Sequence, residues 1–440
     1  MSTIYTTPLY GDLLDSIQPP RVSGTAVLSI PGRCSGQSYS LQLSEDLLSK
    51  HCLLLGGTGS GKTNLIYHMI SQLKPKLAEN DVMIIFDTKG DYLRKFHTEK
   101  DVVLSNDSAH RDFVASWNIY REIVADGWDA SNIVLNANEI AWSLFQEAIE
   151  KNSNQPFFPK AARDLFAAIL IHFLRIGGDD RAFKIKYYNN QALKRYLDIA
   201  TPDKINAILK AEADLAAVKY YLGEKDNNQG LGVFAELQQT IRNIFIGSFA
   251  GNGNFSIRDF VRKKGGKTLF IEYDLTSGSV LTPIYRLLID LALKEALGRS
   301  RGHGNVYIIC DEFKLLPYLQ HIEDAVNFGR SLGVKVVAGL QSISQLYELY
   351  GESRGRSIAS GFSTFITFHL NDVVSRDYVR DLYGKNLILE QYTQLDNSLV
   401  ENQRQGYTVE DWNIQNLKLG EAIIGLPFQK PFRFQVDLFK

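Results

Sequence analysis

Eight consecutive residues of this chain have the types and the spacing of a phosphate-binding loop. They run from Gly56 to Thr63 and fit the pattern G-x-x-x-x-G-K-[ST]. Glycines let backbone N–H groups approach phosphate oxygens because no Cβ stands between them, and a following helix points its positive end at the same anion. Lys62 is expected to reach the terminal phosphates of a nucleotide, and the Thr63 hydroxyl is expected to bind Mg²⁺. The residues predicted to bind the nucleotide are Gly57, Thr58, Gly59, Ser60, Gly61, Lys62, Thr63 and Asn64.

Polar residues at the ends of later apolar runs could complete a hydrolytic site. Asp311 and Glu312 follow the apolar run 306–310, so Asp311 is predicted to bind the metal and Glu312 to polarise a water against the γ-phosphate. Gln341 ends the next apolar run and could touch the γ-phosphate or the attacking water, although it could equally cap the following helix. Arg330 could reach a neighbouring subunit's nucleotide as an arginine finger, although a lone cation at a helix end more often complements the helix dipole.

The elements that must position these residues are strands and helices in alternation. The run 52–55 is predicted to be a strand and 64–70 a helix, so strand, loop and helix occur in the order that the loop requires. Asp87 ends another predicted strand but is followed by Thr88, which makes Asp311 and Glu312 the better carboxylate pair. Further strands are predicted at 268–273, 306–310, 334–340, 362–368, 421–425 and 432–438, and helices at 283–297, 315–331, 343–350 and 373–383.

Between about 120 and 262 the β-branched runs vanish and helical spacing takes over. We therefore predict an α/β fold with a mostly parallel sheet that is interrupted by an all-α block. The predicted domains are a leader with short strands (1–50), a nucleotide-binding domain (51–120 and 263–440) and an all-α insertion (121–262).

Composition places the chain among soluble globular proteins. With 440 residues and a net charge of −1, it has no global attraction to nucleic acid, so any contact with a polyanion must be local. Its three cysteines lack metal-binding spacing, which indicates a reducing compartment and no zinc site. The longest apolar stretch, 165–174, is shorter than the roughly 18 residues that a membrane helix needs, and no signal peptide is visible. We expect a cytoplasmic protein without an integral membrane segment.

Local basic clusters could supply contacts to phosphates, and copies of them in a ring would multiply their charge. A solvated surface is the commoner role of such a cluster. Arg354 and Arg356 are predicted to lie in a glycine-containing loop, a position that would suit a pore loop. The other clusters are Arg181, Lys184, Lys186, Lys194 and Arg195 beside Tyr187 and Tyr188; Arg262, Lys263, Lys264 and Lys267; and Arg299 with Arg301.

Taken in order, the motifs resemble those of the type IV secretion coupling ATPases of the TraG/TraD kind, within the HerA/FtsK group of DNA pumps. The likeness extends from about His51 to the C-terminus. The motifs are Gly56–Thr63, Phe86-Asp87-Thr88-Lys89-Gly90-Asp91, Pro156–Ala162, Cys310–Phe313, and Gly339–Leu346 with Tyr350-Gly351.

This resemblance implies a RecA-like P-loop NTPase core with an inserted all-α domain, assembled as a ring, usually a hexamer, around a channel for DNA. It implies that Lys62 and Thr63 hold ATP and Mg²⁺, and that Asp311 and Glu312 are the Walker B pair. It also implies that Gln341 senses the γ-phosphate and that Arg330 acts in trans. Coupling proteins of this kind usually begin with membrane-spanning helices, and no such segment is found in this sequence.

We therefore expect a Mg²⁺- and ATP-dependent ring motor that translocates DNA, similar to a conjugative coupling protein without a membrane anchor. Its setting could be conjugative transfer, mobile-element processing or anti-phage defence, and its partner could be a nuclease, a relaxase or another effector protein. Two other classes stay open: a ring that pumps or remodels protein, and a nucleotide-dependent switch that scaffolds an effector.

Overall fold

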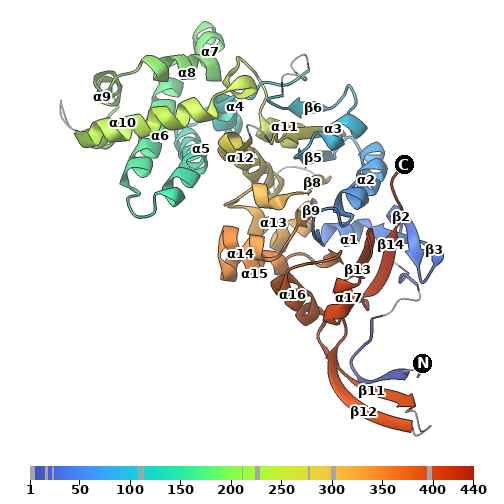
Figure 1. The fold of residues 1–440 in the computed structure, drawn as a ribbon. Helices are drawn as coiled ribbons and strands as arrows, with labels where there is room; N and C mark the ends of the chain where they lie inside the picture. Colours follow the sequence, from blue (N-terminus) through green and yellow to red (C-terminus); the bar gives the residue numbers. More distant parts are fainter. Residues whose placement is uncertain are drawn as a thin grey trace. The chain divides into compact units, whose positions relative to one another are not determined.

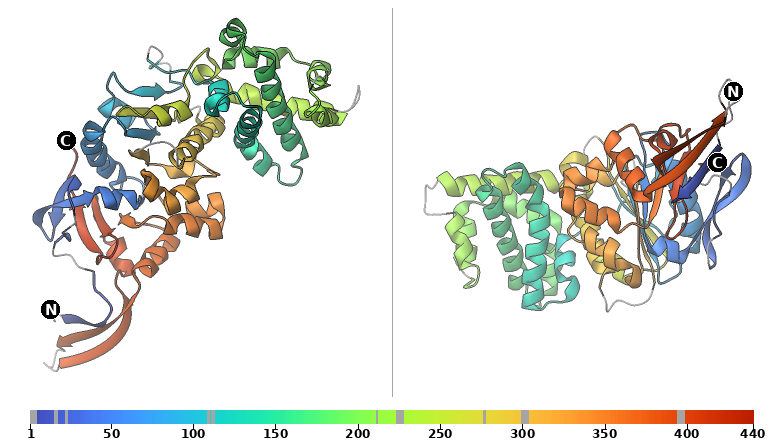
Figure 2. Two further views of the ribbon diagram at one scale, coloured as in Figure 1. Left: turned by 180° about the vertical axis from the view of Figure 1, so that it is seen from behind. Right: turned by 90° about the horizontal axis from the view of Figure 1, so that it is seen from below.

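The fold is known from a computed structural model of the chain, drawn in Figures 1 and 2. It divides into two compact units. The first comprises Met1–Ala78, His303–Pro317 and Ile322–Lys440, and the second comprises Glu79–Gly302 and Tyr318–His321. The residues that the structure describes are 5–14, 18–21, 24–107, 110, 113–210, 212–222, 228–275, 278–298, 304–393 and 399–440.

The first unit contains a sheet that is parallel in its middle and antiparallel toward one edge. The neighbouring strands β10, β4, β9 and β8 run parallel, and every residue of β4 and β9 is buried, as expected of strands covered on both faces. The remaining pairings are antiparallel. The strand order is β3 (Gln37–Ser44), β2 (Ala26–Cys34), β14 (Phe432–Val436), β13 (Glu421–Gly425), β10 (Thr364–Thr367), β4 (Cys52–Leu55), β9 (Val334–Leu340) and β8 (Val306–Cys310).

Helix α2 follows β4 and packs against β2. The helix predicted at 315–331 is wrong at its start, because α13 begins only at Ile322. Pro317 disfavours helical backbone at the residue before it, and Tyr318 has a positive φ of 59°. The helices of this unit are α1 (Glu45–Ser49), α2 (Lys62–Leu73), α13 (Ile322–Phe328), α14 (Ser344–Tyr350), α15 (Glu352–Ser360), α16 (Val373–Tyr383) and α17 (Asp411–Gln415).

A second, three-stranded sheet in this unit was not predicted. Strands β11 (Lys385–Thr393) and β12 (Leu399–Tyr407) form a long antiparallel hairpin, and β1 (Tyr5–Tyr10) pairs with β11 (Figure 1). Strands β2 and β3 belong to the sheet that contains β4 and β9, because β2 pairs with β14 across some 400 positions of sequence.

The second unit combines three parallel strands with a block of helices. Its strands are β5 (Val82–Asp87), β7 (Lys267–Glu272) and β6 (Val102–Leu104), in that order. From α4 to α11 its described residues form helices and turns without a strand. The helices are α3 (Asp91–Phe96), α4 (Ile119–Ile123), α5 (Ala130–Lys151), α6 (Phe157–Ile176), α7 (Arg181–Tyr187), α8 (Asn190–Ile199), α9 (Pro202–Lys210), α10 (Asn228–Ile244), α11 (Ile257–Lys263) and α12 (Gly278–Ala296).

The predicted fold class is confirmed: an α/β protein with a largely parallel sheet and an inserted helical block. The domain boundaries given above stay a prediction. All three cysteines, Cys34, Cys52 and Cys310, are buried free thiols. Among the described residues, no helix is both long and apolar enough to span a bilayer.

Candidate functional site

The predicted phosphate-binding loop connects β4 to α2 in the first unit. Gly59 and Gly61 have positive φ values of 74° and 124°, which side-chain-bearing residues rarely adopt. The loop is also closely packed, since a Cβ on Gly56 would lie 2.7 Å from Cβ of Phe368. Backbone bonds fix its first residues: Gly56 N–H donates to Leu340 O at 3.1 Å, on the neighbouring strand β9. The glycines therefore allow a tight loop that residues with side chains could not form.

Lys62 lies inside the curve of this loop. Its side chain is buried, and Nζ donates hydrogen bonds to Gly56 O at 2.5 Å and to Gly57 O at 3.2 Å. Lys62 is also the first residue of α2, where unpaired N–H groups and the helix dipole favour an anion. The ammonium and the helix terminus thus concentrate positive charge at one point, as a triphosphate site requires.

The two predicted magnesium ligands meet although they are 248 positions apart in sequence. Thr63 Oγ1 donates a hydrogen bond of 2.6 Å to Oδ2 of Asp311, which follows β8. A hydroxyl and a carboxylate are hard oxygen ligands of the kind that Mg²⁺ prefers, and Thr63 follows Lys62 directly in sequence. The donor set at this point therefore fits Mg²⁺.

Glu312 and Gln341 also lie together, at the ends of the neighbouring strands β8 and β9. Gln341 Nε2 donates to Glu312 Oε2 at 2.9 Å, and Thr58 Oγ1 of the loop donates to Gln341 Oε1 at 3.4 Å. Strand β9 lies between β4 and β8, so the amide of Gln341 connects the phosphate-binding loop to the carboxylate. This is where a residue that responds to the γ-phosphate or its attacking water would have to be.

Arg330 lies apart from these residues. It belongs to the 3₁₀ turn Gly329–Leu332, and its guanidinium forms a 2.7 Å ion pair with Asp46 of α1. Both side chains are more than half exposed, at 57% and 56%. Within one chain Arg330 is therefore a surface residue, and a role in trans stays a prediction.

Sequence reasoning missed the C-terminal residues that form one wall of the site. A pocket of about 460 Å³ lies beside the loop. Residues 59–64 line one side of it, and residues of the segments 419–420 and 435–438 line the other. The side chain of Asn64 donates to Asp437 O at 2.9 Å and accepts from Phe439 N–H at 2.8 Å. Gly420 N–H donates to Ser60 O at 2.9 Å. No motif signals these contacts, because the partners are more than 350 positions apart.

The second unit has acidic residues of its own at the ends of its strands. Asp87 accepts hydrogen bonds from the N–H groups of Lys89 and Leu93, so its carboxylate organises the turn into α3. Burial raises the pKa of Asp87 above its usual range, and the nearby Glu272 adds to this effect. These contacts agree with the choice of Asp311 over Asp87 as the metal-binding carboxylate.

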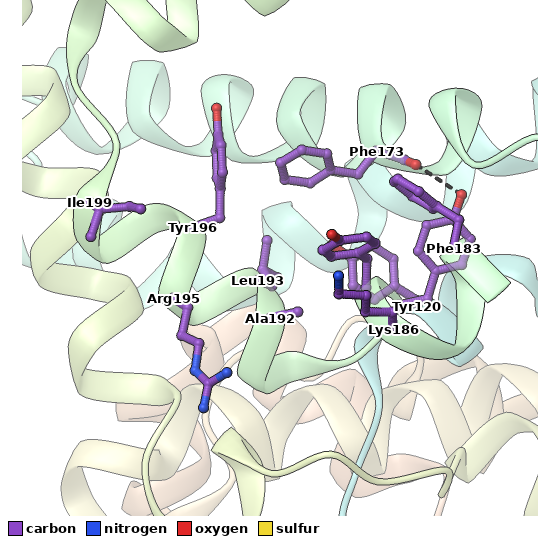
Figure 3. Close-up of a pocket in the computed structure, with 11 residues that line it drawn as sticks. Tyr120, Phe173, Phe183, Lys186, Ala192, Leu193, Arg195, Tyr196 and Ile199 are labelled. Carbon is purple, nitrogen blue, oxygen red and sulfur yellow. Dashed lines mark hydrogen bonds between the residues drawn. The ribbon is translucent and has the colours of Figure 1, made fainter.

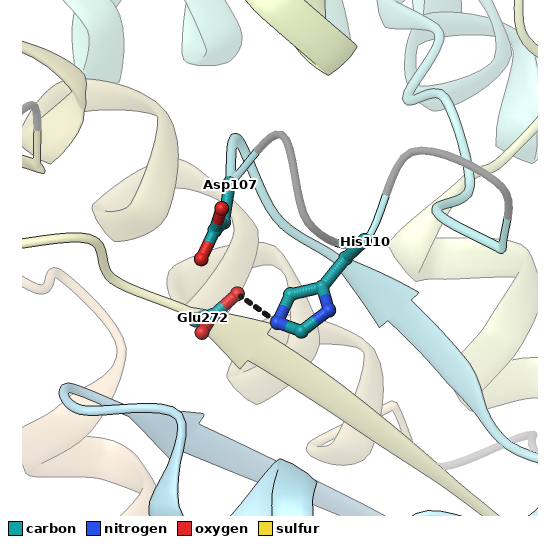
Figure 4. A group of neighbouring side chains, drawn as sticks. All are labelled: Asp107, His110 and Glu272. Carbon is teal, nitrogen blue, oxygen red and sulfur yellow. Dashed lines mark ion pairs between the residues drawn. The ribbon is translucent and has the colours of Figure 1, made fainter.

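Figure 4 shows a group that sequence spacing could not reveal. Asp107, His110 and Glu272 each offer one atom that could bind a metal, and these three atoms lie within 4.8 Å of one another. His110 Nε2 is 3.4 Å from Glu272 Oε2. Glu272 also accepts a hydrogen bond from the Ser105 hydroxyl. Because these protein contacts already satisfy Glu272, we assign no metal to the group.

The structure changes the interpretation of two basic clusters. Arg354 and Arg356 lie in helix α15, so the prediction of a loop is wrong; Arg354 pairs with Glu323 at 3.2 Å, and Arg356 with Glu352 at 2.8 Å. Because both cations already pair with carboxylates, the structure gives no support to a pore loop at this position.

Arg262 is held in a partly buried ion network. It pairs with Asp126 at 2.5 Å and with Glu295 at 2.8 Å, and the buried Arg258 pairs with the same two carboxylates. This residue is therefore part of the packing between helices of the second unit. The cluster of Arg299 and Arg301 lies outside the described residues.

Comparisons with known proteins match most of the chain to one family. A family model described as the DNA-binding domain of the type IV secretion-system coupling protein matches residues 38–429. The coupling protein TraD of Escherichia coli K12 is 23% identical over 334 residues, which are 74% of this chain and 42% of TraD. The coupling protein VirD4 of Bartonella henselae is 21% identical over 322 residues, which are 68% of this chain and 48% of VirD4. The chain thus spans less than half the length of these two relatives.

Among solved structures, the plasmid coupling protein TrwB has a similar fold. In complex with a non-hydrolysable ATP analogue it gives a TM-score of 0.70 at 20% sequence identity, over 91% of this chain and 88% of the TrwB chain. TrwB has also been solved with ADP and Mg²⁺. At this level of identity the likeness establishes the fold.

Proposed function

Because the chain belongs to the family of type IV secretion-system coupling proteins, we propose that it is an ATP-hydrolysing ring motor that translocates DNA. The observation that carries the proposal is the meeting of Thr63 with Asp311 and of Gln341 with Glu312 beside the phosphate-binding loop. Sequence motifs alone do not show that these residues lie close together in the fold. Their contacts support a single hydrolytic site in the first unit.

In the proposed mechanism, the loop and Lys62 bind the phosphates of ATP. Mg²⁺ held by Thr63 and Asp311 would neutralise charge that develops on the phosphate oxygens. Glu312 orients and polarises the attacking water, and Gln341 exchanges its hydrogen bond with Glu312 for one with the water or the γ-phosphate. Loss of the γ-phosphate would let Gln341 return to Glu312, and residues 342–343 would carry this change from Gln341 into α14.

Three findings on relatives support the details. TrwB was solved with ADP and Mg²⁺ and with an ATP analogue, which supports ATP and Mg²⁺ as ligands here. The family model describes a DNA-binding domain, which supports DNA as the polymer. The matched relatives are named coupling and conjugal transfer proteins, which supports a role in delivering DNA to a partner. We propose the cytoplasm as the compartment because the three cysteines are free thiols.

The test is the ATPase rate of the full chain with and without DNA, measured beside the mass of the assembly with ATP present. We expect turnover that requires Mg²⁺, that rises with DNA, and that comes from a ring. Glu312→Gln should bind ATP but hydrolyse it at least about 100-fold more slowly, because the water loses its polarising group.

The same measurements separate the alternatives. An ATPase rate that DNA does not change and that a protein substrate raises would favour a protein pump. A monomeric mass, together with full biological activity of Glu312→Gln, would favour a nucleotide switch. Normal hydrolysis by Glu312→Gln would contradict the catalytic assignment itself.

A further inference from the structure

A second pocket lies among the helices of the second unit, between α6, α7 and α8 (Figure 3). Its volume is about 390 Å³, which is within the size range of small-molecule sites. All its lining residues lie between Tyr120 and Ile199, so it is built within the helical block. Neither the phosphate-binding loop nor the carboxylates of the hydrolytic site take part in it.

Aromatic rings form most of the wall, and the protein fixes several of them. Tyr188 Oη donates to the backbone oxygens of Phe173 and Leu174 at 2.9 and 3.0 Å, and the Tyr188 ring stacks on Tyr120 with centroids 5.1 Å apart. The rings of Tyr196 and Phe173 pack edge to face, with their centroids 4.7 Å apart. Tyr187 is 42% exposed. The aromatic residues that line the pocket are Tyr120, Phe173, Phe183, Tyr187, Tyr188 and Tyr196.

The charged residues of the pocket are two cations. Lys186 of α7 and Arg195 of α8 line it from different helices, and none of the lining residues is acidic. In Figure 3 the Lys186 ammonium lies among the rings, and Nζ is 5.0 Å from the centroid of the Tyr187 ring. The site is therefore electropositive as well as aromatic.

The structure divides the basic cluster that the sequence predicted. Lys184 lies over the ring of Trp128, with Nζ 3.8 Å from its centroid, and Lys194 forms a 2.8 Å ion pair with Asp198. These two cations already have partners outside the pocket. Lys186 and Arg195 are the members of the cluster that line it.

We propose that this pocket binds one unpaired base of single-stranded DNA, with the flanking phosphates on Lys186 and Arg195. Flat aromatic walls match the faces of a base, and the two cations match the anionic backbone: Lys186 lies among the rings, and Arg195 points away from them, where the strand would continue. A base in a duplex hides its faces in the stack, so the pocket selects an unpaired strand. The inference rests on the proposed function, since it assumes that DNA is the polymer, and it names the form of DNA that the helical block holds.

The test is the affinity of the full chain for a short oligothymidine and for a duplex, measured by fluorescence anisotropy over a range of salt concentrations. Tyr187→Ala should weaken binding of the strand at least about fivefold, the effect expected for one lost stacking contact. Tyr187→Phe keeps the ring and should bind like the unchanged protein. Tyr187→Leu, which is apolar but not flat, should lose affinity like Tyr187→Ala, so a general loss of apolar surface is distinguishable from lost stacking.

The cations have their own readout and a matched control. Lys186→Gln and Arg195→Gln should each reduce the slope of log affinity against log salt by about 0.7, the value for one phosphate contact of a single strand. Lys194→Gln removes the same charge from the residue next to Arg195, yet it should leave the slope unchanged because Lys194 is paired with Asp198. Tyr187→Ala should lower affinity without changing the slope.

Equal affinity of the pocket variants and the unchanged protein for the strand would overturn the inference, and would leave another class of ligand, such as an acidic peptide, for this pocket. An equal loss for strand and duplex would also overturn it, because a duplex offers no free base. Failure of the proposed function has a different result: the unchanged protein would bind neither form of DNA, and its ATPase would not respond to either.

Discussion

At the residue scale, Gln341 is central to the proposed hydrolytic site, because its amide joins Glu312 to Thr58 of the loop. Gln341→Ala should lower kcat about 100-fold, as expected when one positioned polar group is removed, and should change the affinity for ATP little. Gln341→Glu would place a second carboxylate beside Glu312, so the acid limb of the pH–rate profile should move to higher pH. Steady-state kinetics and nucleotide binding check both variants, and a Gln341→Ala enzyme with normal kcat would remove Gln341 from the mechanism.

His51, just before β4, makes stability depend on pH. Burial, with a smaller effect of Lys335, lowers the pKa of His51 from 6.5 to about 4, and its Nδ1 accepts a hydrogen bond from Val336 N–H. The folded state therefore keeps the ring neutral, and stability falls as pH decreases from 6.5 toward 4, where only the unfolded chain takes up the proton. Between pH 7 and pH 5 this effect should cost about 2 kcal/mol.

His51→Asn keeps an acceptor for Val336 N–H but cannot titrate. Urea unfolding at the two pH values should show that the variant loses about 2 kcal/mol less than the unchanged protein. Equal losses would mean that other groups cause the pH dependence.

At the scale of elements, the turn before β13 connects the phosphate-binding loop to β14. Gly420 has a φ of 76°, donates to Ser60 O and accepts from Val436 N–H, and a Cβ there would lie 2.8 Å from Gln435 Nε2. Gly420→Ala should destabilise the protein by about 1 kcal/mol or more through backbone strain, and should raise the KM for ATP because relief of that strain shifts the N–H group that anchors the loop at Ser60.

Gly384→Ala is the matched control for this prediction. Gly384 has a similar φ of 78°, but nothing lies within 4 Å of its Cβ position. It should show a similar loss in thermal unfolding with an unchanged KM. If both variants changed KM equally, general destabilisation rather than the anchor would be responsible.

At the scale of the whole molecule, the proposed ring requires that one subunit complete the site of the next. Arg330→Ala and Glu312→Gln should each be nearly inactive alone, but a mixture should regain part of the DNA-stimulated ATPase. Some interfaces would then combine an intact Glu312 with an intact Arg330. Asp46→Asn breaks the same exposed ion pair without removing the guanidinium, so it should stay active and cost little stability. If the mixture regains no ATPase activity and Arg330→Ala is active alone, Arg330 has no role in the mechanism.

Residue type, strand ends and sheet geometry were enough to predict much of the site. Gly56–Thr63 is a local pattern, and Asp311 and Gln341 end apolar runs, so parallel strands bring them to one edge of the sheet. The contacts of Asn64 with Asp437 and Phe439 could not be predicted, because they depend on where the last strand returns.

Two errors have physical causes in the sequence itself. Strand β12 is mostly exposed on both faces, so it lacks the alternation of apolar and polar residues that marks a strand. Gly351 and Gly355 suggested a loop around Arg354, but Gly355 lies within α15 and packs so closely on Tyr347 that a Cβ would be 2.7 Å from that ring. Tertiary packing there outweighs the low helix propensity of glycine.

The burial of all three cysteines has a practical consequence. Burial raises the pKa of Cys52 and Cys310 to about 12, and Cys34 is equally inaccessible at 1% exposure, so native thiols will react slowly with maleimides. Leu135 of α5 is 61% exposed. A Leu135→Cys chain would thus carry a single reactive position, and a spin probe attached there could follow the helical block through each round of turnover without prior removal of native sulfur.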